Sequence, residues 1–340
     1  MKKMKLNIVK TMSILLLVIA LMIIGGVSSL AEAKPLVIGV TQIVEHPALD
    51  AARDGFIAAL EEAGFKEGVD VVYDLQNAQG DFNNAISIAQ KFKDDKVDII
   101  FAIATPTAQA ALQVNNEIPI IITAVTDPVA ASLAKSWESS GNNVTGMSDA
   151  APNKQQVELI LRFVPEAKNV GTIYNAGEAN SVVQVEVAKA VCKELGLNLI
   201  EVSVSNSSEV LMAAQSLADR VDAIYIVTDN TVVSALESVI NVCNQEKIAL
   251  IVADPSSVDK GALASYGIDY FSLGKKSGEF ALKIIKGAKP SDIPLQMITD
   301  PKDLQFVVNL DTAKTIGLTV SEEIIAEADK IIQDGKVQGE

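Results

Sequence analysis

Short apolar runs alternate along this chain with longer stretches in which apolar residues recur every three or four positions. The runs predict buried strands, and the three- and four-residue spacing predicts amphipathic helices. Strands are expected at residues 36–41, 69–75, 97–104, 118–123, 170–174, 198–204, 223–227 and 249–252. Helices are expected at residues 46–64, 82–92, 106–115, 153–163, 181–195, 208–218 and 231–246. This alternation predicts an α/β fold with doubly wound parallel sheets, which carry helices on both faces.

One strand-to-helix passage occurs twice in the chain. Residues 97–107 read VDIIFAIATPT, and residues 221–231, 124 positions later, read VDAIYIVTDNT. A repeat of this length predicts two similar lobes, since solenoid repeats are only about 20–50 residues long. Polar residues follow the strand in both copies, which suggests a cleft between the lobes.

The C-terminal part of the chain continues beyond the second copy. A helix at 268–286, a strand at 304–309 and a helix at 321–333 are expected there. We expect this part to add to both lobes, so that the chain crosses between them several times and forms a hinge of multiple segments. The first lobe would contain residues 34–150 and about 266–300, and the second 151–265 and about 301–340.

The first 33 residues have the pattern of a secretory signal peptide. Four lysines precede the apolar run 12–27, and Ala31-Glu32-Ala33 supplies the small residues of a cleavage site. The apolar run is also long enough for an uncleaved membrane anchor, which is the less favoured alternative. The sequence therefore predicts an exported protein that acts in the periplasm or on the extracellular side of the membrane.

Composition and charge narrow the range of partners. The chain is 49% hydrophobic and 21% charged, as in globular proteins, and its net charge is −15. Such an acidic chain repels nucleic acid and anionic lipid, so we expect neither as a partner. Cys192 and Cys243 both fall in helical patterns. They could form a disulfide in an exported protein, but two buried free thiols are the favoured interpretation.

Candidate ligand contacts lie just after the strands, because ligands of open parallel sheets bind beyond the carboxyl ends of the strands. Hydroxyl and amide groups at helix starts suit a ligand carboxylate, and acidic side chains suit an ammonium group. Taken together, they predict a site for a small zwitterion such as an amino acid, although each residue alone is more often an N-cap. The candidates are Thr41, Gln42, Glu45, His46, Thr105, Thr107, Thr126, Asp127, Asn175, Glu178, Asn180, Ser181, Asp229, Asn230, Thr231, Asp254 and Ser256.

Signals for catalysis are weak. His46 is the only histidine, no G-x-S-x-G motif is present, and one His with two scattered Cys does not make a usual zinc site. Gly274-Lys275 resembles the end of a phosphate-binding loop, but Asp269 stands where the first glycine belongs. We therefore expect no catalytic residues, no metal and no cofactor.

The residues just described resemble the ABC transporter substrate-binding proteins of the tryptophan/tyrosine-type group. The resemblance covers nearly the whole chain after residue 33. It is carried by residues 38–50 (IGVTQIVEHPALD), 76–81 (QNAQGD), 103–107 (IATPT), 126–129 (TDPV), Tyr174-Asn175, Glu178, Asn180-Ser181, 228–230 (TDN) and 261–270 (GALASYGIDY).

The resemblance implies a type I periplasmic-binding-protein fold that closes on one small ligand, with aromatic amino acids favoured. It implies delivery to an ABC permease and its ATPase. We expect the binding protein itself to be a monomer. Many members carry a lipobox cysteine after the signal segment, and its absence here favours a free periplasmic form.

Within this reading, some residues have specific roles. We expect Asp229 or Asp127 at the ligand ammonium, and the ring contacts could come from Tyr174, Tyr266 and Tyr270. Thr105, Thr107, Asn180 and Ser181 are the candidates for the carboxylate. Two alternatives stay open: a sugar or other metabolite bound for a sensor, and an exported hydrolase that uses Asp127 and Asp229 as facing carboxylates.

Overall fold

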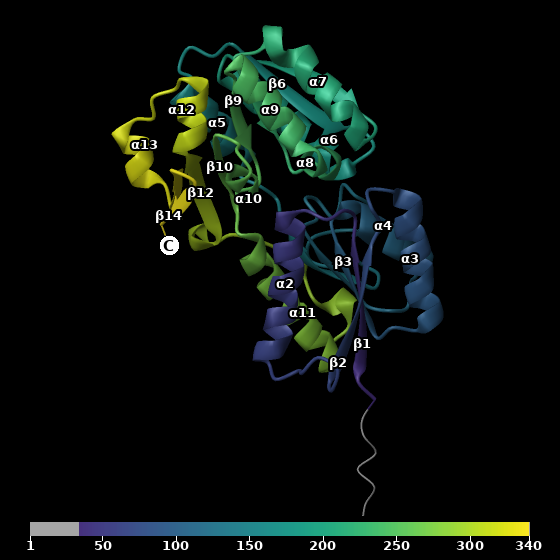
Figure 1. Cartoon of the computed structure of the whole chain (residues 1–340). Coiled ribbons are helices and arrows are strands. Elements are labelled where there is room, and N and C mark those ends of the chain that lie inside the picture. Colours follow the sequence, from purple (N-terminus) through teal and green to yellow (C-terminus); the bar gives the residue numbers. More distant parts are fainter. Residues whose placement is uncertain (1–33, 340) are drawn as a thin grey trace, which may run out of the picture. The chain divides into compact units, whose positions relative to one another are not determined.

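The computed structural model describes residues 34–339, and from Leu36 onward the chain forms one compact unit. The predicted signal peptide, residues 1–33, lies outside the described residues. Two separate sheets, each covered by helices, organise this unit into two lobes (Figure 1). The predicted α/β class with two parallel-dominated sheets is thus confirmed. None of the helices within residues 34–339 combines the length and apolar character needed to cross a membrane.

The first lobe contains a fully parallel six-stranded sheet. Its strand order is β11-β5-β4-β3-β1-β2. The strands are β1 (Leu36–Gln42), β2 (Val71–Asn77), β3 (Ile99–Ile103), β4 (Ile120–Thr123), β5 (Val144–Ser148) and β11 (Gln296–Met297). One face carries α2 (Pro47–Glu62) and α11 (Tyr270–Ile285), and the other carries α3 (Phe82–Asp95) and α4 (Thr105–Val114) (Figure 1).

The second lobe contains eight strands in the order β14-β13-β12-β10-β9-β8-β6-β7. They are β6 (Asn169–Asn175), β7 (Asn198–Val204), β8 (Ala223–Ile226), β9 (Ala249–Val252), β10 (Ala264–Ile268), β12 (Leu304–Asn309), β13 (Lys330–Gln333) and β14 (Lys336–Gln338). β12 runs antiparallel to β10, and β14 antiparallel to β13. The helices are α5 (Asn153–Phe163), α6 (Ala179–Glu194), α7 (Val210–Leu217), α8 (Asn230–Ser234), α9 (Leu236–Glu246), α10 (Ser256–Asp259), α12 (Leu310–Ile316) and α13 (Glu322–Glu327).

The repeat predicted from the sequence is present in the strand order. The order β2-β1-β3-β4-β5 in the first lobe has the same connectivity as β7-β6-β8-β9-β10 in the second. Gly39 in β1 and Gly171 in β6 occupy corresponding places. A Cβ at Gly39 would lie 2.8 Å from the Phe92 ring, and one at Gly171 would lie 2.9 Å from Leu217 Cδ1. Both glycines therefore let a helix pack closely on the strand that begins its lobe.

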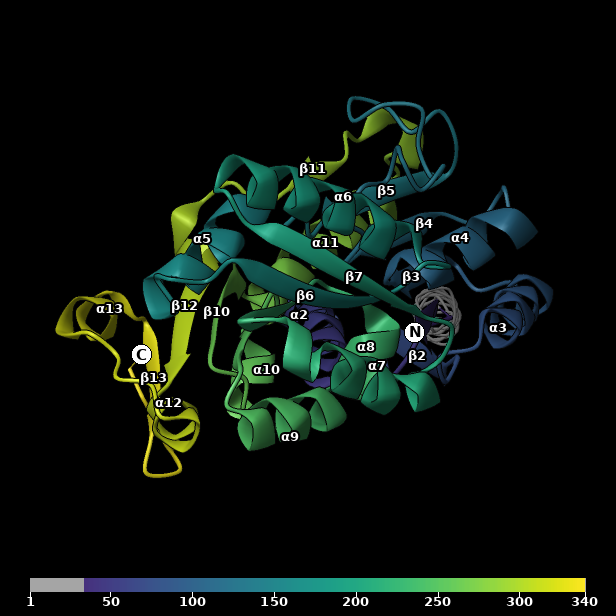
Figure 2. The ribbon, with the colours of Figure 1, turned by 90° about the horizontal axis from the view of Figure 1, so that it is seen from above.

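The two lobes exchange the helices that follow their fifth strands. After β5 the chain leaves the first lobe, and α5 packs beside α6 on the second sheet. After β10 the chain returns, and α11 packs beside α2 on the first sheet (Figures 1 and 2). A third crossing leads from β11 back to β12. Three chain segments thus connect the lobes.

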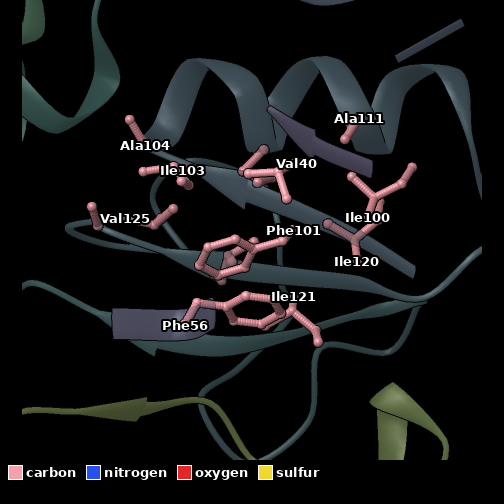
Figure 3. Packing of buried hydrophobic residues seen from close by; sticks show 14 of the residues in the cluster. Val40, Phe56, Ile100, Phe101, Ile103, Ala104, Ala111, Ile120, Ile121 and Val125 are labelled. Atoms are coloured by element: carbon pink, nitrogen blue, oxygen red, sulfur yellow. The ribbon is translucent and has the colours of Figure 1, made fainter. Parts of the chain in front are cut away.

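The core of the first lobe fixes the position of α2. Phe56 of α2 stacks on Phe101 of β3, with ring centroids 3.8 Å apart and planes 13° apart (Figure 3). Both side chains are fully buried, which contributes about 1.5–3 kcal/mol each. Since α2 begins at the carboxyl end of β1, this packing holds the start of the helix at the sheet edge where ligands bind.

Two helix predictions are wrong in detail. The helix expected at 321–333 ends at Glu327, and β13 follows it and pairs with β12. The helix expected at 231–246 is divided at Ala235, whose φ of −116° and ψ of 21° leave the helical region. Strands β5, β10, β11 and β14 were not predicted at all.

The cysteines are free and buried, so the disulfide alternative is wrong. Cys192 lies on α6 and Cys243 on α9, and the two belong to different hydrophobic clusters. Burial raises the pKa of the Cys192 thiol to about 11, which makes it unreactive at neutral pH.

Candidate ligand-binding site

A cavity lies where the carboxyl ends of the strands of both sheets face each other. It encloses about 330 Å³ of space between the protein atoms, a volume that includes space open to solvent. Its lining contains no lysine or arginine. The lining residues are His46, Ala48, Leu49, Ala124, Thr126, Asp149, Asn180, Thr228, Asp229, Asn230, Val233, Asp254 and Tyr270.

The first lobe contributes the start of α2. His46 is its N-cap residue with extended backbone, and no side chain caps this helix. Pro47 has no N–H, so the free donors at this helix start are the N–H groups of Ala48 and Leu49, which line the cavity. His46 is buried, and its Nδ1 has no hydrogen-bond partner among the described residues. Burial lowers the pKa of His46, so the imidazole is neutral at pH 7.

The second lobe contributes Asp229, the N-cap residue of α8. One carboxylate oxygen accepts a 2.7 Å hydrogen bond from the Val232 N–H, and the other accepts a 2.6 Å bond from the Asn175 N–H. Burial and the nearby charge of Glu178 raise the pKa of Asp229 from 3.8 to about 7. A cationic ligand group would relieve this penalty by pairing with the ionised form.

Glu178 joins the starts of α6 and α8. Its carboxylate accepts hydrogen bonds from the N–H and side-chain amide of Asn230, from the N–H and hydroxyl of Thr231, and from the Asn180 amide. These five donors belong to the same lobe. Glu178 therefore fixes the acidic wall of the site, while the Oδ1 of Asn180 stays buried without a partner.

A chain of buried polar side chains closes the back of the cavity. Asp149 lies in the first crossing between the lobes. It accepts a hydrogen bond of 2.8 Å from the Tyr270 hydroxyl and one of 3.1 Å from the Thr126 hydroxyl. Tyr270 begins α11 at the second crossing, so this bond joins two hinge segments. Gln184 of α6 donates to Thr126 across the cleft at 3.4 Å and to Thr228 at 2.6 Å. Burial raises the pKa of Asp149.

Asp254 follows β9 and lies at the second-lobe side of the cavity. Its oxygens accept hydrogen bonds from the N–H and hydroxyl of Ser256 and from the Ser257 hydroxyl, at 2.8–2.9 Å. Asp254 and His46 line the same cavity, and the charge of Asp254 opposes the lowering of the His46 pKa by burial.

The structure brings six of the predicted contacts together in the cavity: His46, Thr126, Asn180, Asp229, Asn230 and Asp254. Asn175, Glu178 and Thr231 line a larger, more open cleft beside it, with Phe82 and Pro106 on the opposite side. Gln42 and Glu45 line a separate groove next to Arg53, and Ser256 lines one at the hinge. The remaining predicted residues do not line the cavity: Thr41, Thr105, Thr107, Asp127 and Ser181.

Several of these absences have a local cause. Asp127 accepts hydrogen bonds from the N–H groups of Val129 and Ala130 and so caps its own turn. The Thr107 hydroxyl donates back to the Ile103 and Ala104 carbonyls. Of the three tyrosines considered for ring contacts, only Tyr270 lines the cavity; Tyr174 is bonded to Glu201, and Tyr266 packs edge-on against Phe306.

Sequence reasoning missed Ala48, Leu49, Ala124, Asp149, Thr228 and Val233. Asp149 follows β5, which was not recognised as a strand. The alternation Val144-Thr145-Gly146-Met147-Ser148 was the available signal. Ala48 and Leu49 are apolar residues inside a predicted helix, so their side-chain chemistry did not mark them as ligand contacts. Within residues 34–339 no group of three or more His, Cys, Asp or Glu is arranged to hold a metal ion.

Comparison with known proteins identifies the family. Residues 37–332 match the sequence model of a family described as "ABC transporter substrate binding protein". A "Tyrosine-binding protein" of Clostridioides difficile (strain R20291) is 45% identical over 281 residues, which cover 83% of this chain and 81% of that protein.

Two solved structures are also similar. An ABC domain from Streptococcus pneumonia in complex with L-Trp is 34% identical and has a TM-score of 0.84, covering 88% of this chain and 100% of that one. A ligand-free, open substrate binding protein from Clostridium difficile is 44% identical but has a TM-score of 0.66, covering 88% and 99%. The expected type I periplasmic-binding-protein fold is confirmed by these similarities and by the two-sheet topology. The chain therefore belongs to the ABC transporter substrate binding protein family, whose members bind substrates and are not enzymes.

Proposed function

We propose that this protein is the extracytoplasmic binding component of an ABC importer and captures an aromatic amino acid between its lobes. It would act as a monomer, deliver the ligand to a membrane permease with its ATPase, and bind no nucleic acid. Residues 1–33 would direct export. The lobes that close would be residues 34–150 with about 266–300, and 151–265 with about 301–340.

The chemistry of the cavity carries this proposal. Acidic side chains stand on the second-lobe wall, an uncapped helix start stands on the first-lobe wall, and the lining contains no basic side chain except the neutral His46. A ligand with one ammonium and one carboxylate group satisfies both walls. An uncharged sugar would leave the buried acid Asp229 without a counter-charge.

The apolar part of the lining favours a large side chain. Ala48, Leu49, Ala124, Val233 and the ring of Tyr270 form this part. Aromatic ligands bury well against such walls. A 45% identical relative is called a tyrosine-binding protein, and a 34% identical relative was solved with L-Trp; these two names support the aromatic class.

Two TM-scores support closure of the lobes around the ligand. The chain superposes better on the L-Trp complex (0.84) than on the ligand-free, open relative (0.66), although the open relative is more identical in sequence. A rotation of one lobe against the other lowers a whole-chain TM-score without changing either lobe. Ligand binding would then shift an equilibrium between open and closed forms.

Calorimetric titration of the purified protein with the twenty amino acids tests the proposal. We expect heat of binding with L-tyrosine or L-tryptophan, and much weaker binding of small or basic amino acids. No heat with any amino acid, or heat only with sugars such as glucose or ribose in a parallel titration, would reject this ligand class.

A further inference from the structure

Two observations single out the start of α2 as a place for an anion. The helix is 16 residues long, and its N–H groups at Ala48 and Leu49 meet the cavity with no capping side chain. Independently, His46 is 8% exposed, lines the cavity, and leaves its buried Nδ1 without a hydrogen-bond partner. Because this nitrogen belongs to a residue that lines the cavity, a ligand group bound there would supply the partner that it lacks.

The other helix starts near the cleft are less suited to an anion. The start of α8 is capped by Asp229, which already accepts the Val232 N–H. The start of α6 carries Glu178, a second negative charge beside Asp229. The start of α4 does not line the cavity, and its Pro106 faces the outer cleft.

The two walls of the cavity also differ in charge. The first lobe contributes His46, Ala48, Leu49, Ala124, Thr126, Asp149 and Tyr270. The one acid among them, Asp149, is hydrogen-bonded to Tyr270 and Thr126, and burial raises its pKa and so favours its neutral form. The second-lobe wall contains Asp229 and Asp254, with Glu178 directly behind. An electrically polar ligand therefore has only one favourable direction across the cavity.

We propose that the ligand lies across the cavity with its carboxylate at the N-terminus of α2, bound by the Ala48 and Leu49 N–H groups and by His46, and its ammonium group at Asp229. This inference rests on the proposed function and deepens it. Each lobe recognises one charged end of the ligand. Only a zwitterion joins the two lobes, so a molecule that lacks either end does not hold the cleft closed.

Asp254 is the group that could reverse this arrangement, since it lines the same cavity as His46. Three donors from Ser256 and Ser257 bind the oxygens of Asp254, and Asp229 likewise accepts from the Asn175 and Val232 N–H groups. Only the experiment decides between the two acids. An Asp254→Asn variant therefore serves as the competitor of Asp229→Asn in the experiment.

A ligand series combined with variants tests the orientation. Calorimetry would compare L-tyrosine with L-tyrosinamide, which lacks the carboxylate charge, and with 3-(4-hydroxyphenyl)propionate, which lacks the ammonium group. L-tryptophan, L-tryptophanamide and indole-3-propionate form the parallel series. We expect Asp229→Asn to lower the affinity for the amino acid about tenfold or more. The same variant should lower the affinity for the propionate less than about threefold.

His46→Asn tests the carboxylate site with a variant whose loss of binding cannot be explained by a loss of stability. Asparagine is a preferred N-cap, so its side chain should accept the free N–H of Ala48 or Leu49. We expect this variant to unfold at an equal or higher temperature than the wild type. We also expect it to bind the amino acid about tenfold more weakly and the amide about as well as the wild type does. His46→Ala should show the same ligand pattern without the gain in stability.

The outcomes separate the two proposals. If the wild type binds neither parent amino acid, the proposed function fails and this inference fails with it. If the wild type binds one of them but His46→Asn leaves its affinity unchanged, only the orientation is wrong. The orientation is also wrong if Asp254→Asn, and not Asp229→Asn, selectively weakens the ligands that carry an ammonium group. Equal weakening of all three ligands by both variants would likewise overturn it.

Discussion

Two buried tyrosine hydroxyls differ in what they contribute to the molecule. The Tyr270 hydroxyl donates to Asp149 at 2.8 Å and joins two hinge segments. The Tyr73 hydroxyl, on β2, is buried without any hydrogen-bond partner among the described residues. Replacing tyrosine by phenylalanine therefore removes a hydrogen bond at position 270 but an unpaired polar group at position 73.

We expect Tyr270→Phe to lower the free energy of unfolding by about 1–2 kcal/mol, because Asp149 loses a buried donor. Tyr73→Phe should change it by less than about 0.5 kcal/mol or increase it, since an unsatisfied hydroxyl is removed. Urea denaturation of both variants measures the difference. Equal losses in the two variants would show that the Tyr270–Asp149 bond has no special stabilising role.

Asp229 gives the stability a specific pH dependence. Its pKa is raised to about 7, so the folded protein binds more protons than the unfolded chain between about pH 4 and 7. The contribution of Asp229 to stability is therefore greatest below about pH 4 and decreases as the pH rises to about 7.

We expect the wild type to lose stability relative to Asp229→Asn across that interval, and the difference to become constant above it. Urea denaturation at a series of pH values measures this. Asn180→Ala, which removes no titratable group, should differ from the wild type by the same amount at every pH. A wild-type advantage over Asp229→Asn that grows with pH would contradict the sign.

At the scale of elements, α2 and α11 approach each other through glycines. A Cβ at Gly274 would lie 2.0 Å from the Ala52 carbonyl oxygen, and one at Gly55 would lie 2.1 Å from the Phe271 carbonyl oxygen. Neither contact can be relieved by moving a side chain, because both involve backbone. The glycine that resembled part of a phosphate-binding loop thus has a packing role.

Gly274→Ala should destabilise the protein by about 1–3 kcal/mol through overpacking, although alanine favours helices by about 1 kcal/mol. Glu279→Ala, at an exposed position of the same helix, is the matched control and should have an effect within about 0.5 kcal/mol. Thermal unfolding compares them. A Gly274→Ala variant as stable as Glu279→Ala would mean that the helices separate at little cost.

The elements that the sequence predicted are those with a strong periodic pattern. The repeated strands and their helices were found because their apolar residues are continuous or helically spaced. β13 was predicted as helix since Ile324, Ile325, Ile331 and Ile332 also fit helical spacing. The segment forms a strand because it pairs with β12, and the Phe306 N–H donates a 2.7 Å hydrogen bond to Asp329 just before it. Neither interaction can be read from the local sequence.

The position of the cavity follows from the fold, and ligand binding by the residues that line it stays a prediction. Six predicted residues line the cavity because the carboxyl edge of a parallel sheet is a property of the fold. By residue type, Thr107, Asp127 and Glu178 were indistinguishable from ligand contacts. In the structure their side chains form hydrogen bonds with groups of their own lobe. Which partner satisfies each side chain depends on tertiary neighbours that periodicity does not contain.

At the scale of the whole molecule, the described arrangement has a side-chain hydrogen bond across the cleft, from Gln184 to Thr126 at 3.4 Å. The hinge segments are tied separately, by Tyr270 to Asp149 and by the Asp269 N–H to the Asp303 carbonyl. Opening of the cleft would therefore break the Gln184 bond while the hinge bonds persist.

We expect saturating L-tyrosine or L-tryptophan to reduce the radius of gyration measured by small-angle X-ray scattering, since the ligand favours the closed form. The Asp229→Asn variant at the same ligand concentration should show a smaller reduction, and L-alanine should show none. Scattering that is identical with and without a ligand shown to bind would rule out closure of the lobes.

The exchange of α5 and α11 also has a consequence for biosynthesis. Translation proceeds from the N-terminus, and early domains ordinarily fold while later ones are still being made. Here the first lobe lacks α11 and β11 until residue 297 has been synthesised. The side of α2 that packs against α11 stays uncovered through most of translation. A complete first lobe cannot form early, so the chain reaches its native state only when nearly all of it has been synthesised.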